Sequence, residues 1–298
     1  MNRNETFVSM WPVEIAELTR SADDRYRRGD YAGAAYEYRA AIVFAEECGA
    51  AGTLQFSALL NNFGVVCKCT GAFDESERAY RRALAIVDQE LGPDHPEVAT
   101  LYHNLGGLEH SRGRHAAGEP FARRSVEIRE KALGPDHPQV AVDLAALAPL
   151  LDGQGKFEES ERMYRRALAI FERAYGSDHY EVGVNLGNLA ALKQAQGKLA
   201  EAEPLYRRAL QIKERHLGAS HPSLATTLNN MAVLADLRGE WSAARALFER
   251  ALSILEPEVS PAHPNLLACR AGYERACRKV VAGAPTLQTA PEPSFLVR

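Results

Sequence analysis

Cysteine is scarce in this sequence, and its five occurrences are too scattered to form a disulfide framework. No run approaches the roughly 18 consecutive apolar residues that a membrane-spanning helix needs. Residues 1–20 contain three glutamates and lack the apolar segment of a signal peptide. These absences predict a soluble, reduced protein that resides in the cytoplasm.

An excess of charge of one sign is also missing, because charged residues make up 25% of the chain and the net charge is only −4. That balance gives no reason to expect nucleic acid or an anionic membrane as the partner. The sequence has no glycine-rich phosphate loop, activated-serine elbow or HExxH zinc motif. We therefore expect no catalytic residues, no cofactor and no metal site. An enzyme built from scattered residues is the least favoured alternative.

A 42-residue repeat occupies most of the chain. Histidine recurs at this interval, and proline follows it in every case but one, where Tyr180 takes its place. A glycine series with the same spacing extends the repeats back towards the N-terminus and indicates six of them. The histidines are His95, His137, His179, His221 and His263, and the glycines are Gly29, Gly71, Gly113, Gly155, Gly197 and Gly239.

Each repeat reads as two helices joined by a tight turn. The first helix follows His-Pro, where proline suits the first helical position, and the recurring glycine then breaks the chain. The second helix ends at a further glycine such as Gly92, the residue that helix C-termini prefer. We expect a lead at 1–12, repeats at 13–50, 53–92, 95–134, 137–176, 179–218 and 221–256 within 13–264, a capping helix at 265–282, and a disordered tail at 283–298.

Small residues such as Gly64 and Ala190 recur where paired helices must approach closely, and large apolar residues such as Tyr80 and Tyr206 recur between them. This pattern, with LGPDHPEVA at 91–99 and QGKLAEAEPLYRRALQIKERHLG at 196–218, resembles the tetratricopeptide repeat of the kinesin-light-chain type. The resemblance implies an all-α, right-handed superhelical solenoid of about six helix-turn-helix repeats with a C-terminal capping helix. It also implies a protein that binds other proteins.

By the same resemblance, the first helices line a concave groove. Asparagine recurs there, and its amide can donate and accept hydrogen bonds along the backbone of an extended peptide. An alternative is that these asparagines only tie each first helix to the next repeat. The expected partner-binding residues are Asn61, Asn62, Lys68, His103, Asn104, Asn188, Gln194, Asn229 and Asn230.

The groove positions carry Lys68 and little other positive charge, so the sequence does not favour an acidic peptide as the ligand. The fourth repeat is irregular, because Pro149 falls in its first helix and Ala146 replaces the recurring asparagine. That irregularity predicts either a kinked or widened groove or a tolerated local variation.

Two other patterns have structural explanations. The recurring histidines lie one repeat apart, so they cannot meet at one metal ion, and helix capping explains them better. Glu77, Glu119, Glu161 and Glu203 each lie four residues before an arginine, which predicts solvated ion pairs along the second helices.

These observations favour a scaffold that binds a protein or peptide in its groove. The alternative is a regulatory subunit that controls a separate effector enzyme, such as a protease or nuclease. Self-association is possible, because a groove of this kind could also accept the tail of a second copy.

Overall fold

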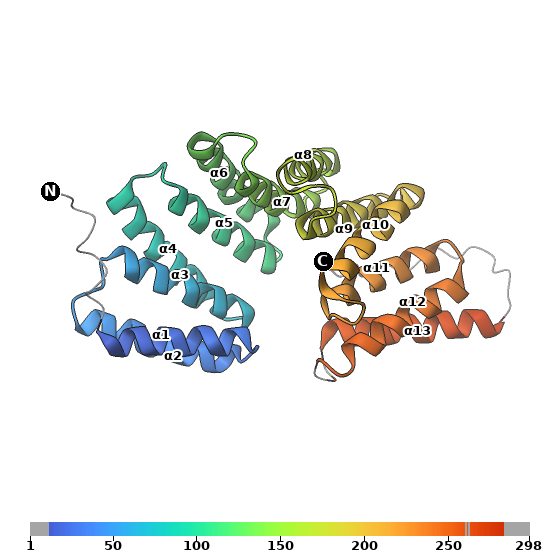
Figure 1. Ribbon diagram of the computed structural model, residues 1–298, viewed down its shortest axis with the longest axis horizontal. Helices are drawn as coiled ribbons and strands as arrows, with labels where there is room; N and C mark the ends of the chain where they lie inside the picture. The colour runs from blue at the N-terminus through green and yellow to red at the C-terminus, as the bar shows by residue number, and fades with distance from the viewer. Residues whose placement is uncertain (1–11, 260, 262, 283–298) are drawn as a thin grey trace. The chain divides into compact units, whose positions relative to one another are not determined.

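The computed structural model describes residues 12–259, 261 and 263–282. The expected tail at 283–298 lies outside the described residues, as does all of the expected lead except Pro12. The described residues form thirteen α-helices and no strands (Figure 1). The prediction of an all-α helical-repeat fold is therefore confirmed.

The chain divides into two compact units, Met1–Lys156 and Phe157–Arg298, and the boundary falls between the two helices of the fourth repeat. The N-terminal unit contains α1 Val13–Arg27, α2 Tyr31–Glu47, α3 Leu54–Cys69, α4 Phe73–Leu91, α5 Pro96–Ser111, α6 His115–Leu133 and α7 Pro138–Asp152. The C-terminal unit contains α8 Phe157–Tyr175, α9 Tyr180–Ala195, α10 Leu199–Leu217, α11 Ser223–Leu237, α12 Trp241–Leu255 and α13 Pro264–Ala282.

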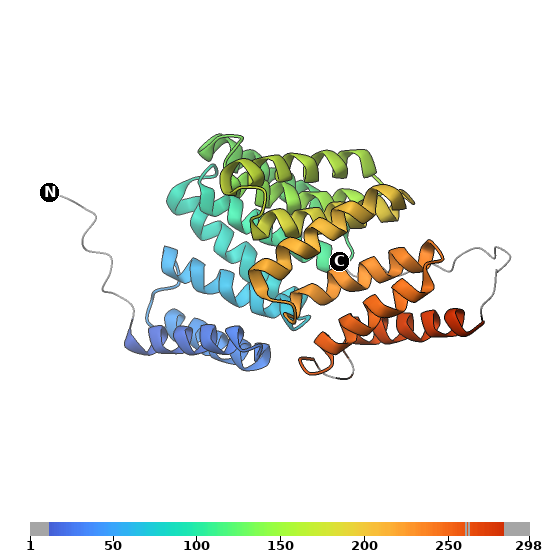
Figure 2. The same ribbon diagram turned by 45° about the vertical axis from the view of Figure 1, so that its right-hand side comes forward.

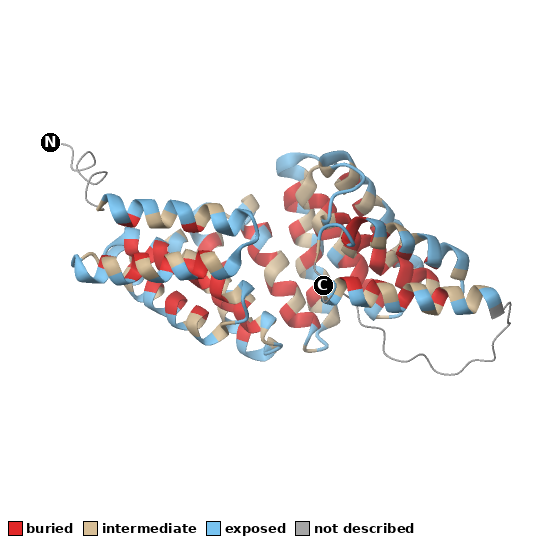
Figure 3. Ribbon diagram, turned by 90° about the horizontal axis from the view of Figure 1, so that it is seen from below, coloured by how far each residue is buried: buried red, intermediate tan, exposed pale blue. Residues whose placement is uncertain are grey.

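Within each unit, consecutive helices pack as hairpins. In the N-terminal unit α1 pairs with α2, α3 with α4, and α5 with α6, and these pairs follow one another as successive layers (Figure 2). In the C-terminal unit α9 pairs with α10 and α11 with α12, and α13 then packs on α12. Buried residues gather where the helices of a unit meet (Figure 3). No hairpin buries its apolar face alone, so each depends on the next.

The recurring histidines cap helices, as the sequence predicted. The Nδ1 atom of His95 accepts a hydrogen bond from the backbone N–H of Glu97 at 3.2 Å, at the start of α5. The equivalent bond recurs at His137, His179, His221 and His263. Each histidine thereby satisfies one of the N–H groups that a helix leaves unpaired at its N-terminus.

Pro149 lies inside the first helix of the fourth repeat, in the last turn of α7. The helix continues for three residues beyond it and ends at Asp152. A proline in the last turn still removes one backbone hydrogen bond, but little helix remains beyond it to be disrupted.

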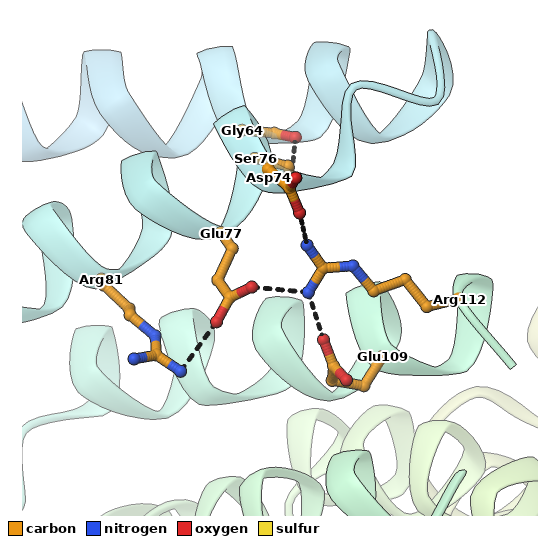
Figure 4. A network of polar contacts seen from close by, with 7 residues as sticks. All are labelled: Gly64, Asp74, Ser76, Glu77, Arg81, Glu109 and Arg112. Carbon is orange, nitrogen blue, oxygen red and sulfur yellow. Dashed lines mark hydrogen bonds and ion pairs between the residues drawn. The ribbon is translucent and has the colours of Figure 1, made fainter. Parts of the chain in front are cut away.

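The glutamates of the second helices form the predicted ion pairs and also join neighbouring repeats. Glu77 pairs with Arg81 four residues later at 2.7 Å, and its other oxygen accepts from Arg112 of the following repeat at 2.6 Å (Figure 4). Arg112 also contacts Asp74 and Glu109. Equivalent bridges connect Glu119 to Lys156, Glu161 to Lys193, and Glu203 to Arg238.

Glu119 provides a test of these bridges. Burial alone would raise its pKa, but hydrogen bonds from Lys156, Gln154 and Arg123 outweigh burial and lower the pKa from 4.5 to about 2. The folded-state pKa lies below the unfolded value. The stabilisation is therefore complete above about pH 4.5 and is lost as the pH falls through about 2.

We expect Glu119→Gln to lower the free energy of unfolding by about 1–2 kcal/mol at pH 7, because a neutral amide cannot replace the charged acceptor. The difference from the wild type should shrink towards pH 2. Urea unfolding at several pH values measures it, with Glu127→Gln as the control, since Glu127 is 68% exposed. A pH-independent difference would show that the charge of Glu119 contributes nothing.

Candidate partner-binding site

We use the term asparagine face for the side of the first helices that carries the predicted partner-binding residues. In the N-terminal unit these asparagines bond to one another. Asn104 donates from Nδ2 to Oδ1 of Asn61 at 2.7 Å, and Asn61 donates to Asn62 at 3.4 Å. Asn62 in turn lies at the hydroxyl of Tyr38 on α2. The three amides therefore link α2, α3 and α5, and all three remain half-buried.

A cleft of about 300 Å³ opens beside Asn61 in the N-terminal unit. Its walls come from the N-terminal halves of α3 and α5 and from the end of α4. Apolar side chains and a few polar groups line it, as in most sites that accept a side chain or small ligand. The lining residues are Leu54, Ser57, Ala58, Asn61, Val87, Leu91, Glu97, Thr100 and Leu101.

His103 belongs to a charged network that the sequence did not indicate. Its Nδ1 donates to Asp143 on α7 at 2.8 Å, and the other oxygen of Asp143 accepts from Nε of Arg129 on α6 at 2.7 Å. Arg129 also donates to Thr100 at 3.2 Å and to Gln139 at 3.0 Å. Asp143 and Arg129 are buried, whereas the side chain of His103 is 28% exposed and stays accessible.

Lys68, also predicted to bind a partner, lies at the C-terminal end of α3 and is half-buried. Its ammonium approaches α5, where a Cβ on Gly107 would lie 3.8 Å from Nζ. Lys68 has no carboxylate within 4.0 Å among the residues that the structure describes.

In the C-terminal unit the structure separates the predicted residues into two groups. Asn188 on α9 is exposed and has no hydrogen-bond partner within the described ranges. By contrast, Gln194, Asn229 and Asn230 are only 5%, 2% and 4% exposed. Asn229 accepts a hydrogen bond from Cys269 on α13 at 3.3 Å. Burial keeps these last three side chains from a partner, and this corrects their inclusion in the expected site.

Lys213 is a residue near the asparagine face that sequence reasoning missed. It lies on the second helix α10, yet its Nζ donates to Oγ1 of Thr227 on α11 at 3.0 Å. A Cβ on Gly187 of α9 would lie 3.9 Å from the same nitrogen. The long side chain thus reaches from a second helix to the two neighbouring first helices. Its spacing of two repeats from Arg129 was the available signal.

The described part of the chain contains no group of three or more His, Cys, Asp or Glu side chains placed to hold a metal ion. None of its helices is long and apolar enough to cross a membrane.

A sequence profile described as tetratricopeptide repeat matches residues 55–117, 97–173, 150–215 and 181–256, which together span more than half of the chain. The chain belongs to the tetratricopeptide repeat family. Among curated proteins, none matches this sequence. Family membership indicates a scaffold for protein interactions, and the matches include no catalytic family.

Several solved structures share the fold. BtubC (BKLC) from P. vanneervenii is 22% identical with a TM-score of 0.56, over 96% of this chain and 97% of that one. The repeats of a putative kinesin light chain from Podosopora anserina are 23% identical with a TM-score of 0.54, over 63% and 89%. The apo form of RapI is 15% identical with a TM-score of 0.61, over 91% and 100%. BtubC and the Podosopora anserina repeats are kinesin-light-chain-like tetratricopeptide repeat proteins, and they confirm the predicted resemblance.

Proposed function

We propose that this tetratricopeptide repeat protein is a non-catalytic, cytoplasmic scaffold whose asparagine face binds an extended segment of a partner protein. The observation that carries the proposal is Asn188, an exposed mid-helix amide without a hydrogen-bond partner in the described residues. Asparagine is a poor helix former, and here no hydrogen bond within the described residues offsets that cost. Its amide can pair with the backbone of a bound peptide.

The N-terminal unit supports the same proposal in a different way. Its amides bond to one another, but they remain half-buried and the cleft beside Asn61 lies next to them. A peptide side chain can enter the cleft while its backbone runs along the amides. Asn61, Asn62, Lys68, His103, Asn104 and Asn188 therefore remain the proposed partner-binding residues.

Capture of partners from the native host tests this function. We expect Asn188→Ala combined with Asn104→Ala to reduce recovery of the partner by about tenfold or more, since several weak contacts act together. The control is Arg207→Ala, because Arg207 lies on the second helix α10 and is 71% exposed. Mass spectrometry with isotope labelling compares wild type, double variant and control, after circular dichroism has shown that all three are folded.

A partner retained by the double variant would place the interface elsewhere and refute the proposed site. An enzyme among the captured proteins would lead to a second assay, in which its turnover is measured with and without the scaffold. A change in turnover would favour the regulatory-subunit alternative.

A further inference from the structure

The second helix of the first repeat, α2, differs from the later second helices at one recurring position. Every later second helix carries an arginine there, whereas α2 carries Ala40. The positions are equivalent because they are separated by multiples of the 42-residue period. The arginines are Arg82, Arg124, Arg166, Arg208 and Arg250.

In later repeats this arginine reaches the preceding second helix. Arg82 on α4 pairs with Glu46 on α2. In the C-terminal unit, Arg250 on α12 pairs with Glu214 on α10 at 2.6 Å. The position therefore faces the place that a preceding second helix occupies. Ala40 faces the same way on α2, where the described chain has no preceding second helix.

An apolar stripe surrounds Ala40. Tyr36 is 73% exposed and Val43 is 51% exposed, and α2 exposes more large apolar side chains than any other described helix. We use the term α2 stripe for five residues whose spacing of three or four places them on one side of the helix. They are Ala32, Tyr36, Ala40, Val43 and Glu47.

The α2 stripe lies on a different side of α2 from the contact with the asparagine face. Residues two positions apart are separated by about 200° around a helix. Tyr38 is two positions after Tyr36, and its hydroxyl lies at Asn62 of the asparagine face. The α2 stripe is therefore a separate surface. Because the end repeats of an array need a polar outer surface to stay soluble, an apolar one indicates that another polypeptide covers it.

Opposite charges lie at the two ends of the α2 stripe. Glu47 is the last residue of α2, and Arg28 lies in the turn just before the helix. Both side chains are exposed, and neither has an opposite charge within 4.0 Å among the described residues. One end of the surface is thus acidic and the other basic.

This distribution of charge is complementary to itself when two copies of α2 lie antiparallel. Tyr36 is four residues before Ala40 and Val43 is three residues after it, so each ring opposes the valine of the other copy. Glu47 of one copy then approaches Arg28 of the other. A parallel pair would instead bring like charges together at both ends, which is unfavourable.

We propose that a second copy of this chain covers the α2 stripe, with the two α2 helices antiparallel about a two-fold axis near Ala40. The small side chain at the axis allows the helices to approach to about 8 Å. The proposal does not depend on the proposed function, because it uses a different surface. A dimer carries two asparagine faces, so a partner that is itself dimeric binds with increased avidity.

Analytical ultracentrifugation of the full chain tests the proposal. We expect wild type to be dimeric at about 10 µM. Tyr36→Arg should weaken dimerisation about a hundredfold, because a two-fold axis removes the ring from both sides of the interface. The variant should fold, since α4 and α8 carry Arg78 and Arg162 at the equivalent position. Circular dichroism checks the fold.

Leu267→Arg is the matched control, because Leu267 on α13 is 50% exposed and lies outside the α2 stripe. It also replaces one exposed apolar side chain with arginine, and it should leave the dimer intact.

A charge exchange tests the antiparallel arrangement. Arg28→Glu and Glu47→Arg should each weaken dimerisation about tenfold, because each brings like charges together. The double variant should restore it, since the opposite charges again meet between copies. In a parallel pair neither single substitution would weaken the dimer.

Defined results overturn the proposal. One is a wild type that stays monomeric at about 0.1 mM, where a contact of micromolar affinity would be filled. Another is a dimer that resists Tyr36→Arg, or that Leu267→Arg weakens equally. A stripe covered by another segment of the same chain would give a monomer whose melting temperature falls in Tyr36→Arg. Failure of the double charge variant to restore the dimer would overturn the antiparallel arrangement.

Discussion

Replacing Asp143 with alanine is expected to destabilise the N-terminal unit by about 3–5 kcal/mol, because it leaves the Arg129 guanidinium buried without its counter-charge. Asp143 is 1% exposed and Arg129 is 8% exposed, so water cannot replace the lost carboxylate. The His103 imidazole loses its acceptor in the same change. Few substitutions of a single polar residue should affect this protein more.

If the unpaired charge of Arg129 causes the loss of stability, removing that charge as well should restore the stability. Arg129→Met combined with Asp143→Leu removes both charges and fills the space with apolar atoms, and the double variant should recover to within about 1 kcal/mol of wild type. Hydrogen exchange of the amides in α5, α6 and α7 measures the local stability. If the double variant is no more stable than Asp143→Ala, a buried unpaired charge is not the cause of the loss.

A matched substitution in the C-terminal unit should behave differently. Thr227→Ala removes the hydroxyl at the position equivalent to Asp143. We expect it to lower the free energy of unfolding by only about 1 kcal/mol, because one neutral hydrogen bond to Lys213 is lost.

The fold could be predicted almost entirely from the sequence, because each repeat carries its own local signals. His95 and Pro96 mark a helix start, and Gly92 ends the preceding helix with a φ of 86°, a value that favours glycine. The histidine at the helix start recurs five times and the glycine at the helix end four times, and these copies reinforce one another. Placing the end of one helix did not require knowing its distant neighbours.

The site was harder to predict because burial depends on those neighbours. Asn188 and Asn230 occupy the same position in their repeats, yet the first is exposed and the second is 4% exposed. Asn230 lies beside Tyr206 and accepts from Asn229, a residue that α13 covers through Cys269. The sequence of one helix alone does not show which of its side chains the following helix buries.

Long charged side chains added a second difficulty. The spacing predicted the ion pairs within second helices, such as Glu77 with Arg81, and the structure confirms them. It did not predict that Glu77 would also bind Arg112 of the next repeat, or that Lys213 would reach the first helices. The side chains of Arg112 and Lys213 each span several ångströms, so the position of the Cα does not fix the position of the charge.

Gly64 gives the second large expected effect. A Cβ on Gly64 would lie 2.6 Å and 2.8 Å from two ring carbons of Tyr80, which is fully buried. A hydrogen bond of 2.7 Å from Ser76 Oγ to the Gly64 carbonyl holds the two helices at this separation. We therefore expect Gly64→Ala to lower the free energy of unfolding by about 2 kcal/mol, even though alanine favours helix formation by about 1 kcal/mol.

Gly106→Ala is the matched control, since it changes the equivalent position of the next repeat. There an added Cβ would lie 3.3 Å from Ala122, a small residue that needs to shift only slightly. The helix-forming advantage of alanine should offset that shift and leave stability within about 0.5 kcal/mol of wild type. Hydrogen exchange of α3–α6 compares the two variants. Equal losses would mean that the Tyr80 ring does not set the separation of α3 and α4, and that some feature shared by both repeats does.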